Sequence, residues 1–237
     1  MRNPIIVALD VPTVERATVL VERVAPFVGA FKIGSELFTT AGPEIVRQIR
    51  RLGASVFLDL KFHDIPNTVA KSVSAATRLN VQMLTIHTGG GLEMIKAAEA
   101  AAQETAKQLA IEPPQVLGVT VLTSMAEGSL LEVGVEVSSI EQQVERLARL
   151  AVRAGIRGLV CSPLELAMLR RVLPPSTQLV TPGIRAPGDD AGDQKRTLSA
   201  KEAIAAGANW LVIGRPIYAA PDPAKAAEAI FASLNGV

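Results

Sequence analysis

Residues 57–69 read FLDLKFHDIPNTV and place Asp59, Lys61, His63 and Asp64 within six positions of an otherwise apolar segment. Side chains of an extended strand alternate between its two faces, so Asp59 and Lys61 share one face. Burying charged groups costs free energy unless they are paired. A fold alone does not require this arrangement, and we interpret it as part of a site that performs chemistry.

Several kinds of chemistry can use a lysine between carboxylates. Carboxylates often hold Mg²⁺ or Zn²⁺, but Lys32 and Lys61 nearly neutralise Asp59 and Asp64 and leave little attraction for a divalent cation. A Schiff-base lysine must lose its charge, whereas the neighbouring carboxylates stabilise charged Lys61. A lysine that stays protonated suits the stabilisation of a carbanion and proton donation to it. A structural ion-pair network is the alternative without chemistry.

Few other residues offer metal or redox chemistry. The single cysteine, Cys161, lies in the apolar run GLVCSP, which predicts a core thiol and fits a reducing cytoplasm. The two histidines, His63 and His87, are too few and too far apart in the sequence to indicate zinc. We interpret His63 as support for the site and His87 as packing. We predict neither a metal nor a cofactor.

The composition limits the possible partners. The formal net charge is +1, aromatic residues make up 3% of the chain, and the sequence has no basic run, which argues against nucleic acid. No apolar run is long enough to span a membrane, and the N-terminus has no signal-peptide pattern. We therefore expect a cytoplasmic protein that acts on a small molecule.

Short apolar runs alternate with amphipathic segments along the whole chain. Two of the amphipathic segments begin with a capping-box pattern, at Ser138 and Glu141 and at Ser199 and Glu202. The eight predicted strands span residues 5–10, 30–34, 55–62, 82–87, 115–122, 158–162, 177–183 and 210–216.

Eight strand–helix units predict a parallel sheet covered by helices. In 237 residues without an internal linker, this favours one α/β domain, a (β/α)₈ TIM barrel over residues 1–237. An open, doubly wound sheet is the alternative. It is less favoured because no G-x-G-x-x-G motif follows the first strand.

Catalytic groups of such barrels lie at the C-terminal ends of the strands and in the loops that follow. Polar residues do occupy these positions. They are Asp10, Lys32, Asp59, Lys61, His87, Thr123, Ser124 and Arg215.

The loops after the seventh and eighth strands are the usual phosphate site of this fold. Gly183 and Gly214 permit close approach of the backbone to a ligand, and Arg185 and Arg215 offer paired donors. These features predict a phosphate site. The alternative is a surface loop whose arginines are solvated or paired with neighbouring aspartates.

The segment FLDLKFHDIPNTV resembles the D-x-K-x-x-D signature of the orotidine 5′-monophosphate decarboxylase family. IIVALD, FKIG, VLTS, TPGIR with a downstream glutamine, and VIGRPI follow in the order of that family, so the resemblance covers essentially the full chain. The short signature is shared with sugar-phosphate decarboxylases and synthases of the same superfamily. The flanking KFHDIPNT and the TPGIR loop make the resemblance more specific.

The resemblance implies roles for the charged residues. Lys61 resembles the lysine that donates a proton to C6 of the pyrimidine. Asp59 and Asp64 alternate with Lys32 and Lys61 around the departing carboxylate. In a homodimer, Asp64 and Thr68 would enter the site of the partner subunit.

The resemblance also implies the residues that bind the nucleotide. Asp10 and Lys32 would hold the ribose, Thr123 and Ser124 the base, Gln194 would bridge base and phosphate, and Gly214, Arg185 and Arg215 would hold the phosphate, with Pro182 as a further contact.

The implied reaction is the conversion of orotidine 5′-monophosphate to UMP and CO₂, the last step of pyrimidine synthesis, without a cofactor. A Mg²⁺-dependent 3-keto-hexulose-phosphate decarboxylase or aldolase is the alternative enzyme. A barrel that binds nucleotides without turnover is the non-enzymatic alternative.

Overall fold

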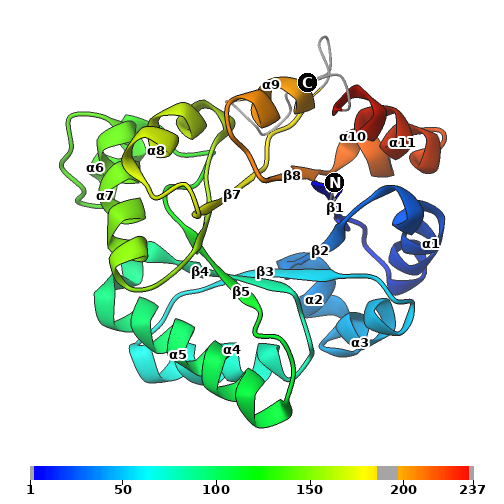
Figure 1. Cartoon of the computed structure of the whole chain (residues 1–237), viewed down its shortest axis with the longest axis horizontal. Coiled ribbons are helices and arrows are strands. Elements are labelled where there is room, and N and C mark those ends of the chain that lie inside the picture. Colours follow the sequence, from blue (N-terminus) through cyan, green and yellow to red (C-terminus); the bar gives the residue numbers. More distant parts are fainter. Residues whose placement is uncertain (1–2, 186–196, 235–237) are drawn as a thin grey trace.

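The computed structural model describes residues 3–185 and 197–234, and eight parallel strands close into a barrel in the order β1 to β8 (Figure 1). Each strand pairs with its neighbour in the sequence, and β8 pairs with β1. The strands are β1 Ile5–Ala8, β2 Ala30–Gly34, β3 Val56–Phe62, β4 Met83–His87, β5 Gln115–Val119, β6 Gly158–Val160, β7 Gln178–Thr181 and β8 Trp210–Ile213. This confirms the predicted (β/α)₈ barrel.

Helices surround the barrel on its outside (Figure 1). They are α1 Val14–Val24, α2 Ser35–Ala41, α3 Glu44–Arg51, α4 Pro66–Thr77, α5 Gly91–Leu109, α6 Glu127–Glu132, α7 Ile140–Arg153, α8 Leu166–Val172, α9 Ala200–Ala205, α10 Arg215–Tyr218 and α11 Pro223–Leu234. Within the described ranges, none of these helices is both long and apolar enough to cross a membrane.

The alternation of side chains along each strand divides the core into two layers. One layer lies between the strands and the helices, and it includes Ile5 and Val7 of β1. The other layer fills the barrel interior, with Phe57 of β3 and Met83 of β4 among its members. Fully burying a side chain of this kind is worth about 1.5–3 kcal/mol. The interior layer forms an apolar floor beneath the C-terminal ends of the strands.

Several strands end earlier than predicted. β1 ends at Ala8 rather than residue 10, β5 at Val119 rather than 122, and β8 at Ile213 rather than 216. Asp10 and Thr123 therefore lie in loops, and Arg215 is the first residue of α10. The apolar runs continue past these points, but pairing with the neighbouring strands does not, and a single sequence carries no record of that pairing.

The helix starts agree with the sequence in one case and differ in the other. Ser199 and Glu202 form the predicted capping box before α9. The box predicted at Ser138 and Glu141 is wrong, because Ser139 caps α7 and accepts a hydrogen bond from the backbone N–H of Gln142. Two adjacent serines offer equivalent caps, and the path of the preceding loop selects between them.

Candidate active site

A cavity of about 440 Å³ opens at the C-terminal ends of the strands. Apolar side chains such as Phe57 and Val212 line its base, and polar residues of several strands and loops line its walls. The predicted site residues that line it are Asp10, Lys32, Asp59, Lys61, Thr123, Pro182, Arg185, Gly214 and Arg215. The fold therefore brings together residues that lie far apart in the sequence.

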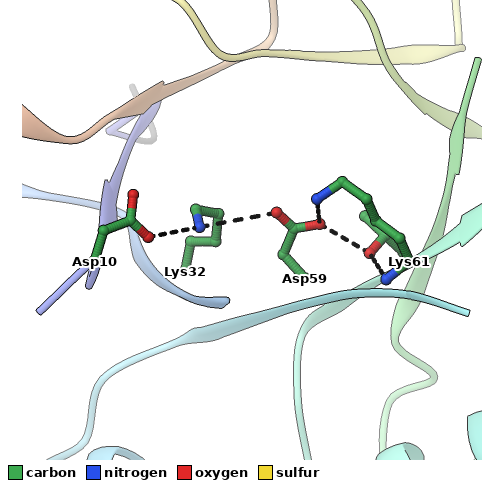
Figure 2. Close-up of polar contacts among 5 residues, drawn as sticks. Asp10, Lys32, Asp59 and Lys61 are labelled. Atoms are coloured by element: carbon green, nitrogen blue, oxygen red, sulfur yellow. Dashed lines mark hydrogen bonds and ion pairs between the residues drawn. The ribbon is translucent and has the colours of Figure 1, made fainter. Parts of the chain in front are cut away.

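Four charged side chains form a row of alternating sign across this cavity (Figure 2). Lys32 Nζ lies 3.0 Å from Asp10 Oδ1 and 3.8 Å from Asp59 Oδ2. Lys61 Nζ lies 2.9 Å from Asp59 Oδ1. Each charge in the row has at least one neighbour of opposite sign, which offsets the cost of removing it from water.

Burial is greatest in the middle of the row. The side chains of Lys32 and Asp59 are 11% and 13% exposed, whereas those of Lys61 and Asp10 are 35% and 48% exposed. The inner pair is thus shielded from solvent, and Lys61 is the more accessible of the two ammonium groups. A molecule in the cavity would meet Lys61 while Asp59, which Lys32 flanks, holds the ammonium in place.

An irregularity in β3 places Lys61. Leu58 pairs with Leu84 and Phe62 pairs with Ile86, so residues 59–61 face one residue of β4. Lys61 has a φ of 51°, a left-handed conformation that is uncommon outside glycine. The strict alternation predicted for this strand is therefore wrong at the bulge, although both Asp59 and Lys61 do line the cavity.

Thr85 of β4 contributes to the site and was not found from the sequence. Its Oγ1 donates a hydrogen bond to Asp59 Oδ1 and accepts one from the backbone N–H of Lys61, both at 2.9 Å. A weak signal for it exists in the run QMLTIH. Thr85 lies two residues after Met83, which faces the barrel interior, so the side chain of Thr85 points to the same face of the strand, toward the site.

The loops after β7 and β8 form the opposite wall of the cavity. Gly183 has a φ of 80°, which favours glycine, and the backbone N–H of Arg185 donates a hydrogen bond to Leu198 O in the segment before α9. The guanidinium of Arg185 also donates to Ile184 O at 2.9 Å. Glu36 and Tyr218 line the cavity as well and were not predicted.

Four predicted residues are not placed at the cavity. Asp64, Thr68 and Ser124 are exposed and do not line it, and Gln194 lies outside the described residues. Asp64 Oδ1 accepts a hydrogen bond from the backbone N–H of Ile65. Asp64 lies in the loop after β3, and Thr68 lies in the first turn of α4.

The two histidines lie close together, although they are distant in the sequence. The ring centroids of His63 and His87 are 5.4 Å apart. Burial lowers the pKa of His87, and the positive charges of His63 and Lys61 lower it further. Across the described part of the chain, no three or more His, Cys, Asp or Glu residues are grouped so as to hold a metal ion.

Cys161 is a buried thiol, as predicted. It is 1% exposed at the cavity wall, and its sulfur lies 3.7 Å from the hydroxyl of Thr181. Burial raises its pKa to about 12, so the nucleophilic thiolate is not populated near neutral pH.

Comparison with known proteins gives consistent matches along the chain. Residues 3–230 match the profile of the "Orotidine 5'-phosphate decarboxylase / HUMPS family". A protein of Moorella thermoacetica named orotidine 5'-phosphate decarboxylase is 49% identical over 237 residues, which cover 100% of this chain and 94% of that protein. A protein of Opitutus terrae with the same name is 53% identical over 235 residues, covering 99% of this chain and all of the other.

Solved structures agree with the sequence matches. The crystal structure of orotidine 5'-phosphate decarboxylase from Lactobacillus acidophilus superimposes with a TM-score of 0.87 at 35% identity, covering 98% of this chain and 99% of that one. An uncharacterized conserved protein from Geobacillus kaustophilus superimposes with a TM-score of 0.83 at 31% identity, covering 98% and 100%.

Proposed function

This chain belongs to the orotidine 5′-phosphate decarboxylase / HUMPS family, and from that premise we propose that it converts orotidine 5′-monophosphate to UMP and CO₂. The relatives at 49% and 53% identity carry the name of this activity, which favours a nucleotide over a sugar phosphate as substrate. The observation that carries the proposal is the row Asp10, Lys32, Asp59 and Lys61 across the cavity. We place the reaction as the last step of pyrimidine synthesis in the cytoplasm.

The reaction needs a positive charge beside the carbon that loses CO₂. Loss of CO₂ from C6 leaves an electron pair in the plane of the ring, where the π system cannot delocalise it. Without a cofactor as electron acceptor, the protein must stabilise this charge electrostatically. We assign that role to the ammonium of Lys61, which then donates its proton to C6.

Asp59 keeps Lys61 in position before the substrate arrives, and Lys32 in turn contacts Asp59. Asp59 holds Lys61 at 2.9 Å and is itself flanked by Lys32 at 3.8 Å. Because these contacts already hold the ammonium in place, little reorganisation is needed when charge develops in the transition state. The carboxylate of Asp59 also faces the region from which the substrate carboxylate departs.

The phosphate of the substrate would bind at the opposite wall, remote from Lys61. Arg185 and Arg215 offer charge-assisted hydrogen bonds there, and Gly214 permits close approach of the backbone. Binding energy gained at a remote group accelerates the reaction when it helps to organise the reacting centre. We assign the ribose to Asp10 with Lys32.

The remaining substrate contacts come from the loops. We assign the base to Thr123 and Ser124, with Pro182 as a further contact and Gln194 between base and phosphate. Thr123 and Pro182 line the cavity in support of this assignment.

We propose a homodimer in which Asp64 and Thr68 enter the partner's site. Both residues are exposed beside the cavity of their own chain without lining it. Ile65, which lies between them, is itself 66% exposed. A two-fold axis would make each chain lend the same residues to the other.

We also propose that turnover needs no metal. The carboxylates of Asp10 and Asp59, which a cation would need as ligands, each contact a lysine ammonium instead. A Mg²⁺-dependent sugar-phosphate enzyme, the alternative, needs carboxylates available to the cation.

The test is to incubate the purified protein with orotidine 5′-monophosphate after dialysis against EDTA and to follow the loss of its ultraviolet absorbance. Formation of UMP at the same rate with and without EDTA is the expected result. Activity that returns only with Mg²⁺, or turnover of a sugar phosphate without a base, would favour the alternative enzyme. Nucleotide binding without release of CO₂ would favour a binding protein.

A further inference from the structure

We propose that Thr85 is a positioning residue for the reaction, because its hydroxyl forms hydrogen bonds that hold both Lys61 and Asp59 in position. This inference rests on the proposed function, since it assigns Thr85 to the step in which Lys61 acts. Thr85 lies behind the charged row rather than in it, and it is absent from the residues that line the cavity.

The register between β3 and β4 brings Thr85 to the bulge in β3. The bulge sets Asp59, Leu60 and Lys61 opposite Thr85 alone. An extra residue in a strand loses its partner in the neighbouring strand, so its backbone groups need another one. The side chain of Thr85 fills this role, since its Oγ1 accepts the backbone N–H of Lys61 at 2.9 Å.

The hydroxyl of Thr85 accepts one hydrogen bond and donates another. A backbone N–H can only donate, and an ionised carboxylate can only accept. The hydroxyl of Thr85 therefore accepts from Lys61 N and donates its single proton to Asp59 Oδ1, also at 2.9 Å. One side chain thus fixes the backbone that carries the ammonium and the carboxylate that holds the ammonium.

The backbone of Lys61 adopts a left-handed conformation. A φ of 51° is unfavourable for a residue with a side chain, and such conformations persist where the surroundings hold them. Thr85 is 0% exposed, so water does not readily replace its hydroxyl. Without that hydroxyl, the Lys61 N–H loses its acceptor, and the backbone can relax toward a more common conformation that moves Nζ.

Movement of Nζ affects the rate more than binding. The nucleotide would keep its contacts to the phosphate and ribose residues, none of which touches Thr85 in the hydrogen bonds of the described residues. Catalysis depends on the distance between Nζ and the reacting carbon, and a displacement of about 1 Å can cost roughly 10²-fold in rate. Loss of the hydroxyl should therefore lower kcat and leave KM nearly unchanged.

The test compares Thr85→Val, which keeps the shape and removes the hydroxyl, with Thr85→Ser, which keeps the hydroxyl. The valine variant should lose at least about tenfold in kcat with KM within about threefold, and the serine variant should stay within about threefold of wild type. Thr77→Val is the matched control. It removes an equally buried hydroxyl, bonded to Val73 O in α4, and should leave kcat unchanged.

Hydrogen exchange supplies a measurement that does not depend on turnover. The amide of Lys61 should be protected in wild type and in Thr85→Ser, and it should exchange at least about tenfold faster in Thr85→Val, because the acceptor is gone. Thr85→Ala, which introduces no new bulk, replaces the valine variant if that protein does not fold, with the same expected changes.

The outcomes separate the two proposals. Faster exchange at Lys61 in Thr85→Val, together with a wild-type protein that does not decarboxylate orotidine 5′-monophosphate, would support the positioning contact and overturn the proposed function. An active wild type whose folded valine variant keeps full kcat would overturn the role of Thr85. If Thr85→Val and Thr77→Val change kcat and KM to the same extent, Thr85 contributes only to general stability, which also overturns the proposal.

Discussion

Replacing Lys61 with alanine removes one ammonium from the cavity and leaves its carboxylate partner held by other groups. Asp59 keeps Lys32 at 3.8 Å and the hydroxyl of Thr85 at 2.9 Å. At an effective dielectric constant of about 20, gross Coulomb attraction is roughly 6 kcal/mol for the 2.9 Å pair with Lys61 and roughly 4 kcal/mol for the 3.8 Å pair with Lys32. The stronger contact is lost, but Asp59 is not left unpaired.

The variant should therefore fold. The net loss of stability should be about 1–2 kcal/mol, well below the gross attraction, because Lys61 is 35% exposed and water replaces part of the contact. Thermal unfolding followed by circular dichroism measures this loss, and binding of UMP by calorimetry checks that the nucleotide site survives.

Turnover should fall far more than stability. Removing one preorganised electrostatic group typically costs about 10²–10³-fold in kcat, and loss of a general acid costs about 10²–10⁴-fold. Because Lys61 is proposed to do both, we expect a loss of about 10⁴-fold or more in the absorbance assay.

The matched control is Lys107→Ala, which removes an exposed lysine from the last turn of α5 and should leave turnover unchanged. The role assigned to Lys61 is wrong if its alanine variant is folded, binds UMP and keeps more than about a tenth of wild-type turnover.

Three further predictions follow from the same site. Arg215→Ala should lose charge-assisted hydrogen bonds of about 1.5–3 kcal/mol each, so activity on the intact nucleotide should drop sharply while activity on orotidine without phosphate stays as poor as in wild type. A large extra loss on orotidine would show that Arg215 supports the fold instead. Subunit exchange between inactive Lys61→Ala and Asp64→Ala dimers should restore about a quarter of the sites, because mixed dimers contain one intact site. No recovery after confirmed exchange would return Asp64 to its own chain. The thiol of Cys161 should resist a disulfide reagent in the native protein and react once the protein is unfolded, because burial raises its pKa to about 12. Rapid reaction in the native state would contradict this burial.

Patterns in the sequence predicted the architecture and the inward direction of the main charged residues. Strand–helix alternation and helix caps are local patterns, and they predicted the barrel and the capping box at Ser199 and Glu202. Period-two alternation predicted that Asp59 and Lys61 share the cavity side, and both line the cavity although the bulge interrupts the alternation between them. The fold rule for C-terminal strand ends predicted that Lys32 lies beside them. These inferences succeed because each depends on neighbours within a few residues or on a rule common to all such barrels.

The geometry that makes the site specific arises from contacts between strands, which the sequence does not reveal. The bulge in β3, the left-handed backbone of Lys61 and the role of Thr85 arise from the register between two strands. That register depends on how eight strands close into one barrel, which no local pattern records. The contact between His63 and His87 has the same origin, since residues distant along the chain become neighbours only when the strands pair.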